Sequence, residues 1–174
     1  MTSFAALDFE TADHGADSAC AIGLSVVRDG IREDTVYRLI RPPRRKMMFT
    51  HIHGIHWSDV AEAPLFPEVW RDIEPCLEDV DFLAAHNASF DSRVLQGCCA
   101  AYDMEDPTTP FVCTVQLARK LWDIRPTKLP DVCRYLAISL DHHHAASDAE
   151  ACAQIVIAAL EDGWTPTDKD LRTP

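Results

Sequence analysis

The chain has 174 residues, of which 47% are hydrophobic and 25% are charged, so it contains enough apolar material for the core of about one domain. Its formal net charge of -12 at pH 7 argues against a protein that holds nucleic acid along a broad basic surface, because lysine and arginine make the phosphate contacts. No apolar window is long enough to span a bilayer and the N-terminus lacks the features of a secretory signal, so we expect a cytoplasmic protein without a membrane partner.

The first half of the chain predicts three strands in a meander, at residues 4–9, 19–27 and 35–40. A basic run at 41–46 (RPPRRK) could contact phosphates, but we interpret it as a solvated loop. The loop continues to about residue 64, and apolar residues at 67–77 have helical spacing.

The second half alternates between strands and helices. Strands are expected at 82–87 and 111–115, and helices from residue 88 and over 116–122, 128–138 and 144–160. This order predicts an α/β fold with a mixed sheet, organised as one domain over 1–163 with a loose C-terminal tail at 164–174. The seven cysteines include no C-x-x-C pair and are expected to be buried thiols of a reducing compartment.

Asp8 and Glu10 stand one residue apart at the end of the first predicted strand, so their side chains point to the same face of the sheet. Two adjacent carboxylates repel each other unless a cation lies between them. Hard oxygen ligands suit Mg²⁺ or Mn²⁺, and open α/β sheets bind ligands at the carboxyl ends of their strands. The pair is therefore a candidate metal site, although an isolated D-x-E is more typical of solvated charge.

Two further aspartates stand at the beginnings of predicted helices. Asp91 follows His86 and Asn87 at a strand end, although the helix dipole alone also favours an aspartate there. Asp148 precedes Cys152 by four residues and lies on the apolar stripe of the last helix, where an ionised carboxylate is costly unless it is paired or binds a metal. Both are candidate metal ligands.

Three segments, LDFET at 7–11, HNASFD at 86–91 and HHAASDA at 143–149, occur in this order along the chain. In order and spacing they resemble the three exonuclease motifs of the DEDDh 3′–5′ exonucleases, the group that includes the proofreading epsilon subunit of bacterial replicative DNA polymerase. The segment THIHGIHWSDV resembles the T-x-I-H-G-I loop of that family. The resemblance covers about residues 4–160.

This resemblance implies an RNase H-like fold: a five-stranded mixed sheet, flanked by helices, whose second strand is antiparallel to the rest. It implies a metal-dependent 3′–5′ exonuclease that releases nucleoside 5′-monophosphates from nucleic acid with a free, single-stranded 3′ end, with DNA favoured over RNA. Asp8, Glu10 and Asp148 would hold one of two divalent cations, Mg²⁺ or Mn²⁺. Asp8 would bridge to the second cation, and Asp91 would reach it through water.

The resemblance also implies residues that contact the terminal nucleotide, with Ile55 lying against its base. The expected substrate-binding residues are Phe9, Thr11, Ala12, His53, Ile55, Asn87 and Phe90. For the two phenylalanines core packing is the competing explanation. The segment DHGADSAC at 13–20 departs from the family pattern, and the chain resembles stand-alone relatives more than a dedicated proofreading subunit, so nothing in it supports a polymerase complex as partner.

The three consecutive histidines at 142–144 are resolved only by the family pattern H-x-A-x-x-D-A, which fits His143, Ala145, Asp148 and Ala149. His143 is thereby the expected general base, and His142 and His144 are expected to be neighbours without a catalytic role.

Two other classes of protein remain as alternatives to a DNA exonuclease, besides an exoribonuclease of the same fold. A zinc or other transition-metal hydrolase could take ligands from His51, His53, His56 and the 142–144 run, because imidazole suits such ions. A nucleic-acid-binding module without catalysis is disfavoured, because all five positions of the DEDDh pattern are filled.

Overall fold

The structure, a computed structural model, describes residues 2–172, apart from the side chain of residue 34. Six strands form one sheet in the order β3-β2-β1-β4-β5-β6. Their bounds are β1 Phe4–Thr11, β2 Ala19–Arg28, β3 Ile31–Leu39, β4 Phe82–Ala85, β5 Phe111–Cys113 and β6 Leu171–Arg172. Strand β2 runs antiparallel to β1 and β3, whereas β4 and β5 run parallel to β1. The predicted mixed sheet with an antiparallel second strand is confirmed, but it has six strands instead of the predicted five, because β6 adds antiparallel at the edge next to β5.

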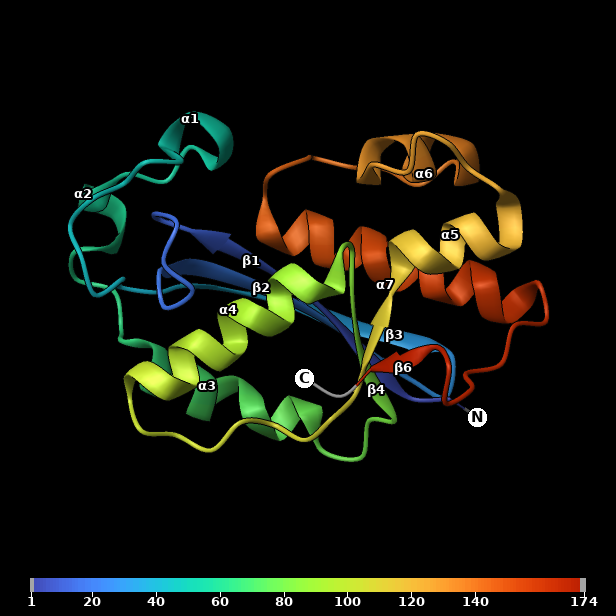
Figure 1. The fold of residues 1–174 in the computed structure, drawn as a ribbon, viewed down its shortest axis with the longest axis horizontal. Coiled ribbons are helices and arrows are strands. Elements are labelled where there is room, and N and C mark those ends of the chain that lie inside the picture. The colour runs from blue at the N-terminus through green and yellow to red at the C-terminus, as the bar shows by residue number, and fades with distance from the viewer. Residues whose placement is uncertain (1, 173–174) are drawn as a thin grey trace.

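Helices cover both faces of this sheet (Figure 1). They are α1 Thr50–His53, α2 Trp57–Val60, α3 Phe66–Ile73, the 3-10 helix η1 Glu74–Leu77, α4 Ala88–Ala101, α5 Thr114–Trp122, α6 Leu129–Leu136 and α7 Ala145–Glu161. Helices α3 and α4 lie below the sheet in the view of Figure 1, and α5, α6 and α7 lie above it. The loop expected at 41–64 therefore contains two short helices that its weak periodicity did not indicate.

The alternation of side chains along β1 divides the core into two clusters. Ala5, Leu7 and Phe9 pack with residues of α3 and α4. Phe4 and Ala6 point to the opposite face, where they pack with residues of α5, α6 and α7. Because a strand has a period of two, residues 8 and 10 continue the face that α7 covers. The fold therefore directs two carboxylates toward α7.

Helix α7 approaches the sheet at Gly23 of β2, which pairs with Asp8 across the ladder. A Cβ atom at Gly23 would overlap with the backbone carbonyl of Ala145, the first residue of α7. Glycine alone permits this close backbone approach. The beginning of α7 is thereby held directly beside the end of β1.

The C-terminal segment is not a loose tail over the residues that the structure describes. Trp164 is buried against Phe82, with 6.2 Å between the ring centroids. Strand β6 then adds to the sheet by pairing antiparallel with β5. The prediction of a tail at 164–174 is therefore wrong for residues 164–172, while 173 and 174 lie outside the described residues.

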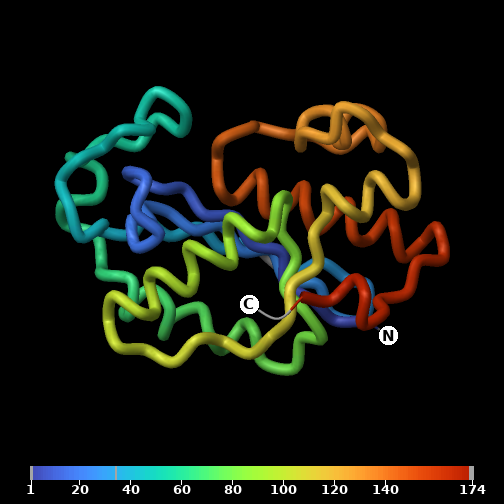
Figure 2. Tube along the Cα trace, viewed as in Figure 1, coloured from blue at the N-terminus to red at the C-terminus, as the bar shows by residue number. Residues whose placement is uncertain are grey.

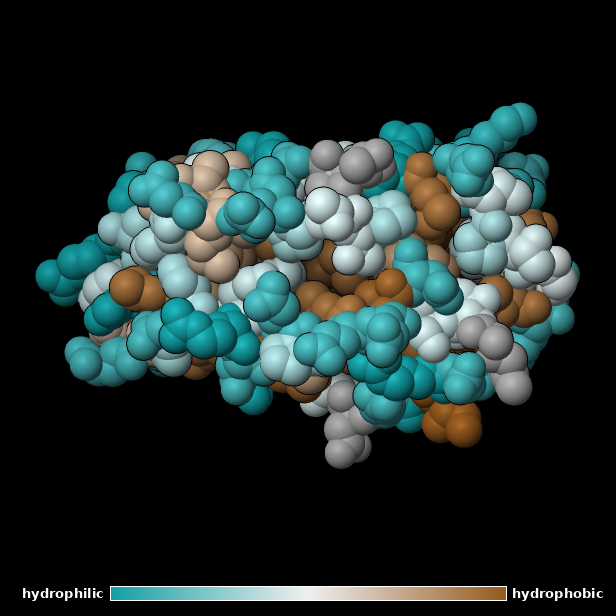
Figure 3. Space-filling view, turned by 90° about the horizontal axis from the view of Figure 1, so that it is seen from below, coloured by the Kyte–Doolittle hydropathy of each residue, from teal (hydrophilic) through white to brown (hydrophobic). Residues whose placement is uncertain are grey.

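Hydrophilic residues cover most of the face seen in Figure 3, and apolar residues show in a hollow near its centre. All seven cysteines are free thiols; the prediction of burial is confirmed for five of them, whereas Cys76 and Cys113 are half-buried. Within residues 2–172, no helix has the length and apolar character needed to cross a membrane.

Candidate active site

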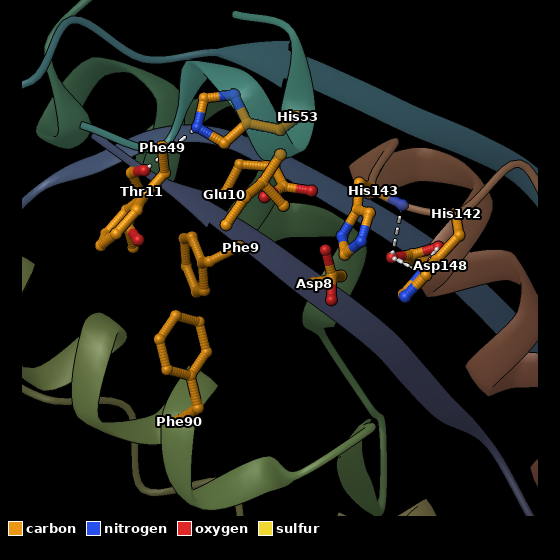
Figure 4. Close-up of a pocket in the computed structure, with 11 residues that line it drawn as sticks. Asp8, Phe9, Glu10, Thr11, Phe49, His53, Phe90, His142, His143 and Asp148 are labelled. Carbon is orange, nitrogen blue, oxygen red and sulfur yellow. Dashed lines mark hydrogen bonds and ion pairs between the residues drawn. The ribbon is translucent and has the colours of Figure 1, made fainter. Parts of the chain in front are cut away.

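Three carboxylates meet at the end of β1. Asp8 and Glu10 come from that strand, and Asp148 comes from the first turn of α7 (Figure 4). The oxygen atoms that they would offer to a cation all lie within 4.8 Å of one another. The predicted shared face of Asp8 and Glu10 is confirmed, and so is the inward position of Asp148, which is buried.

The carboxylates destabilise one another's charged forms. Burial is the main cause of the raised pKa of Asp8, and the neighbouring Asp91, Asp148 and Glu10 raise it further. Burial, followed by Asp148 and Asp91, raises the pKa of Glu10 to about 8. Burial also raises the pKa of Asp148. A divalent cation would remove this repulsion, and a set of hard oxygen ligands suits Mg²⁺ or Mn²⁺. The residues present therefore fit such an ion.

Asp91 lies behind these three residues and does not line the cavity in front of them. Its Oδ1 accepts a hydrogen bond of 3.0 Å from the backbone N–H of Phe9, and the side chain is buried. Burial raises the pKa of Asp91 to about 7. The structure thus couples Asp91 to the carboxylate group electrostatically, but it is not part of the set within 4.8 Å.

His143 stands at the carboxylate group, as the sequence predicts, with its backbone N–H 3.2 Å from Oδ2 of Asp148. Its backbone is left-handed, with φ of 69°, a conformation that is uncommon for a residue other than glycine. Burial lowers the pKa of His143, and His142 adds to this effect. The imidazole is therefore biased toward its neutral form, which a proton acceptor requires.

His142 was expected to be a neighbour, but it contacts the site directly. Its Nδ1 lies 3.0 Å from Oδ2 of Asp148, and its ring stacks on that of His143 at 3.7 Å between centroids. His144 lies elsewhere and stacks on Tyr37, as expected for a residue outside the site. The contact of His142 could not be inferred from spacing, because it depends on the loop conformation just before α7.

A cavity of about 330 Å³ opens in front of the carboxylates. We call it the terminal pocket. Segments 42–60 and 137–145 lie on either side of the end of β1 (Figure 2), and residues of both line the cavity. Its lining includes four of the predicted substrate-binding residues, Phe9, Thr11, His53 and Phe90, together with Phe49 and Ile52. Sequence reasoning missed these last two: Phe49 is the residue just before α1 and Ile52 lies within that helix.

His53 joins α1 to the end of β1. Its Nδ1 accepts a hydrogen bond from the N–H of Ile55, so its Nε2 carries the proton and donates to the carbonyl of Thr11 at 3.2 Å. Burial lowers the pKa of His53, in keeping with this neutral form. His53 thereby fixes the wall of the terminal pocket that carries Phe49 and Ile52.

Ala12 and Ile55 are not brought to the terminal pocket. Both are buried in a small apolar cluster with Cys20, Ala21 and Val60. The expectation that Ile55 lies against a base is therefore corrected, because Ile52 occupies the pocket wall and Ile55 packs inward. Asn87 lies apart from this pocket and lines an adjoining cavity instead.

The basic run at 41–46 is largely engaged within the protein. Arg44 makes ion pairs of 2.8 Å with Asp13 and 2.6 Å with Asp17, which hold the loop after β1. The guanidinium of Arg45 lies 5.4 Å from the ring centroid of Trp57. The run is a loop, as predicted, but these contacts hold Arg44 and Arg45 to the protein, so it is not simply solvated.

The histidines of the alternative transition-metal site do not assemble among the described residues. The second group that could hold an ion consists of His142, His143 and Asp148, and it shares Asp148 with the carboxylate group. His51, His53 and His56 do not belong to it. A hydrolase site with histidines from both segments is therefore not formed.

The raised carboxylate pKa values predict how stability depends on pH in the absence of metal. The pKa of Glu10 rises from 4.5 to about 8 in the folded protein, so the folded state binds more protons than the unfolded state between these values. In EDTA, thermal stability should fall as the pH rises through this window. Glu10→Gln should make the fall shallower, and Glu62→Gln, the same change at an exposed position, should not. If the thermal stability of Glu10→Gln falls with pH as steeply as that of the unaltered protein, the raised pKa of Glu10 is contradicted.

Comparison with known proteins gives a family match over most of the chain. The RNase_T family, described as exonuclease, matches residues 5–156. The PolC-type DNA polymerase III of Thermotoga petrophila is 31% identical over 163 residues, which is 91% of this chain and 12% of that protein. The corresponding protein of Bacillus subtilis is 34% identical over 128 residues, 69% of this chain and 9% of the relative. The matched part of the chain thus spans only about a tenth of the length of these relatives.

Solved structures share the fold over nearly the whole chain. Exonuclease X in complex with 5′ overhanging duplex DNA is 25% identical, with a TM-score of 0.76 over 93% of this chain and 94% of that chain. The nuclease domain of 3′hExo, a DEDDh family member bound to rAMP, is 19% identical, with a TM-score of 0.81 over 99% of this chain and 96% of that chain. The second likeness concerns the fold alone.

Proposed function

The chain belongs to the DEDDh group of the RNase_T exonuclease family, and from this premise we propose that it removes nucleotides one at a time from the 3′ end of single-stranded DNA. The observation that carries the proposal is the meeting of Asp8, Glu10, Asp148 and His143 at the floor of one pocket. This supports the proposal, because three carboxylates and an imidazole line a single cavity of about 330 Å³.

Asp8, Glu10 and Asp148 are the residues that would hold a pair of divalent cations, with Asp91 behind them. When bound, such cations polarise the phosphate and lower the pKa of a bound water. Before binding, the carboxylates repel each other, and Asp91 adds to the raised pKa of Asp8. Without a cation, the raised pKa values mean that the folded chain binds protons at this site, whereas a bound cation would relieve the repulsion and leave the carboxylates ionised.

His143 serves as the general base. Its neutral imidazole takes a proton from the attacking water, whose oxygen forms a bond to phosphorus. The bond between phosphorus and the 3′ oxygen of the preceding nucleotide breaks, and that oxygen takes up a proton from solvent. The products are a nucleoside 5′-monophosphate and a strand shortened by one nucleotide with a free 3′ hydroxyl.

The terminal pocket would hold the nucleoside that leaves. Phe49 and Ile52 offer an apolar wall for the base, and Phe90 lies on the opposite side of the pocket beside Phe9 (Figure 4). DNA is favoured over RNA because the two relatives named above are DNA polymerases and Exonuclease X is bound to DNA.

The proposal is tested with 5′-labelled single-stranded DNA and RNA of the same sequence, in Mg²⁺, Mn²⁺ or EDTA. The label should remain on a ladder of products that shorten from the 3′ end, nucleoside 5′-monophosphates should accumulate, and EDTA should stop the reaction. DNA should be cut faster than RNA. Uncut substrates in both metals would refute the nuclease, and faster cleavage of RNA would assign the substrate to the other nucleic acid.

A further inference from the structure

A second cavity, of about 470 Å³, adjoins the terminal pocket and shares Asp8, His142 and Asp148 with it. Its other walls come from the end of β4, from α5 and from the segment before α6, and they include Asn87, Arg119 and Lys128. The carboxylate group therefore lies between two cavities. A strand whose last nucleotide filled the terminal pocket would place its preceding nucleotide in the second cavity.

Two smaller cavities continue this path. One, of about 130 Å³, shares Asn87 and Arg119 with the second cavity, and it reaches Arg172 of β6. The other smaller cavity, of about 230 Å³, shares Ser89 and Arg172 with the 130 Å³ cavity, and it extends along α4 to Arg93. We call these three connected cavities the upstream groove. It runs from the carboxylates past the beginning of α4 to the edge strand β6.

The charge of the upstream groove is opposite to that of the whole chain. Apart from Asp8 and Asp148 at the carboxylate site, its lining contains no acidic residue. Four of the sixteen lysine and arginine residues line it, namely Arg93, Arg119, Lys128 and Arg172. Among residues 2–172, none of these four makes an ion pair, whereas the net charge of the chain is -12. Cations without acidic partners in an acidic protein suit a polyanion.

The walls of the upstream groove are held in place by hydrogen bonds. His86 bridges the end of β4 to the segment before α6, with its Nδ1 2.8 Å from Thr114 Oγ1 and its Nε2 3.0 Å from the carbonyl of Thr127. Arg119 donates through Nε to Thr127 Oγ1 at 3.0 Å. This bond orients Arg119 and leaves its terminal nitrogens as donors for a phosphate.

We propose that the upstream groove binds the phosphodiester backbone of the nucleotides that precede the 3′-terminal one. The inference rests on the proposed function, because it takes the terminal nucleotide to occupy the terminal pocket. Arg119 and Lys128 contact the backbone next to the cleavage site, and Arg172 and Arg93 contact it farther upstream. The groove thus sets the preference for strands over short fragments, and it supplies most of the salt dependence of binding.

The test compares two substrates in the intact protein. The p-nitrophenyl ester of thymidine 5′-monophosphate carries no upstream nucleotide, whereas a single-stranded oligonucleotide of several nucleotides fills the groove. Arg172→Glu should lower kcat/KM for the oligonucleotide by about tenfold relative to the ester, and it should reduce the salt slope of binding by about 0.7 to 1 for each phosphate that the protein no longer neutralises. Arg93→Glu, on the exposed face of α4, is a second variant if the change in β6 disturbs folding.

Arg71→Glu is the matched control, because it makes the same charge change on α3 at an exposed position outside the groove. It should leave both substrates unaffected. If the oligonucleotide and the ester respond equally to Arg172→Glu and Arg93→Glu, or if Arg71→Glu has the same effect as these variants, the upstream groove is refuted. If the unaltered protein cleaves neither substrate, the proposed function fails instead, so the two failures are distinguishable.

Discussion

Asp8→Asn should lower kcat by roughly 10³-fold or more, because stabilisation by metal cations is worth several kcal/mol and each 1.36 kcal/mol is a factor of ten. The amide has lost the negative charge that makes Asp8 a strong ligand. It also no longer repels Glu10, Asp91 and Asp148, whose proximity helps to raise the pKa of Asp8. In EDTA, Asp8→Asn should therefore be more thermally stable than the unaltered protein at neutral pH, while its activity in Mg²⁺ is lost.

Opposite changes in activity and stability identify the charge of Asp8 as the cause. A variant that merely misfolded would lose both. Asp168→Asn, the same change at an exposed position of the C-terminal segment, serves as the control and should alter neither property. The measurements are kcat in Mg²⁺, thermal unfolding in EDTA and titration of metal binding by calorimetry. Metal binding of unchanged affinity in Asp8→Asn would contradict the assigned ligand.

His143→Ala should lower kcat by about 10² to 10⁴-fold, which is the usual effect of removing a general base. Its contact with Asp148 is made by the backbone N–H, so the substitution retains that hydrogen bond and should leave metal affinity nearly unchanged. His143→Asn is a second variant, because asparagine tolerates the left-handed backbone found here better than alanine does. In the unaltered protein, kcat should decrease at low pH as the histidine base is protonated. This decrease should be absent in both variants.

The two adjacent histidines provide comparisons for this prediction. His144→Ala should retain nearly full kcat, since its ring stacks on Tyr37 outside the terminal pocket. His142→Ala removes a side chain that contacts Asp148, so it should change metal affinity more than the pH profile. If His142→Ala abolishes the decrease of kcat at low pH and His143→Ala preserves it, the general base is His142, and the assignment made from the family pattern is wrong.

The parts of the site that the sequence predicts are those set by regular geometry. The period of two along β1 places Asp8 and Glu10 on one face, and the helical period of α7 places Asp148 inward. By contrast, the position of His142 depends on the loop before α7, which has no periodicity. Helix α1 has only four residues, too few for a pattern to distinguish Ile52 from Ile55.

The C-terminal strand shows the same limit on a larger scale. Leu171–Arg172 is too short to produce an alternating pattern, and it forms a strand only because β5 offers an unpaired edge. The position of β6 in the fold could not be predicted from the sequence. The contribution of Arg172 to the upstream groove, which begins at the carboxylates, could not be predicted either. Residues that belong to a site through such pairings are found only in the folded chain.

Gly23 bears no functional group, yet it governs how far apart the ligands are. Asp8 and Asp148 are separated by most of the chain, and they meet because the first residue of α7 rests on the backbone of β2 at Gly23. Any larger residue at this position would act as a spacer between the sheet and α7, and it would move Asp148 away from Asp8 and Glu10. A residue without any functional group in the second strand therefore sets the spacing of the three carboxylates.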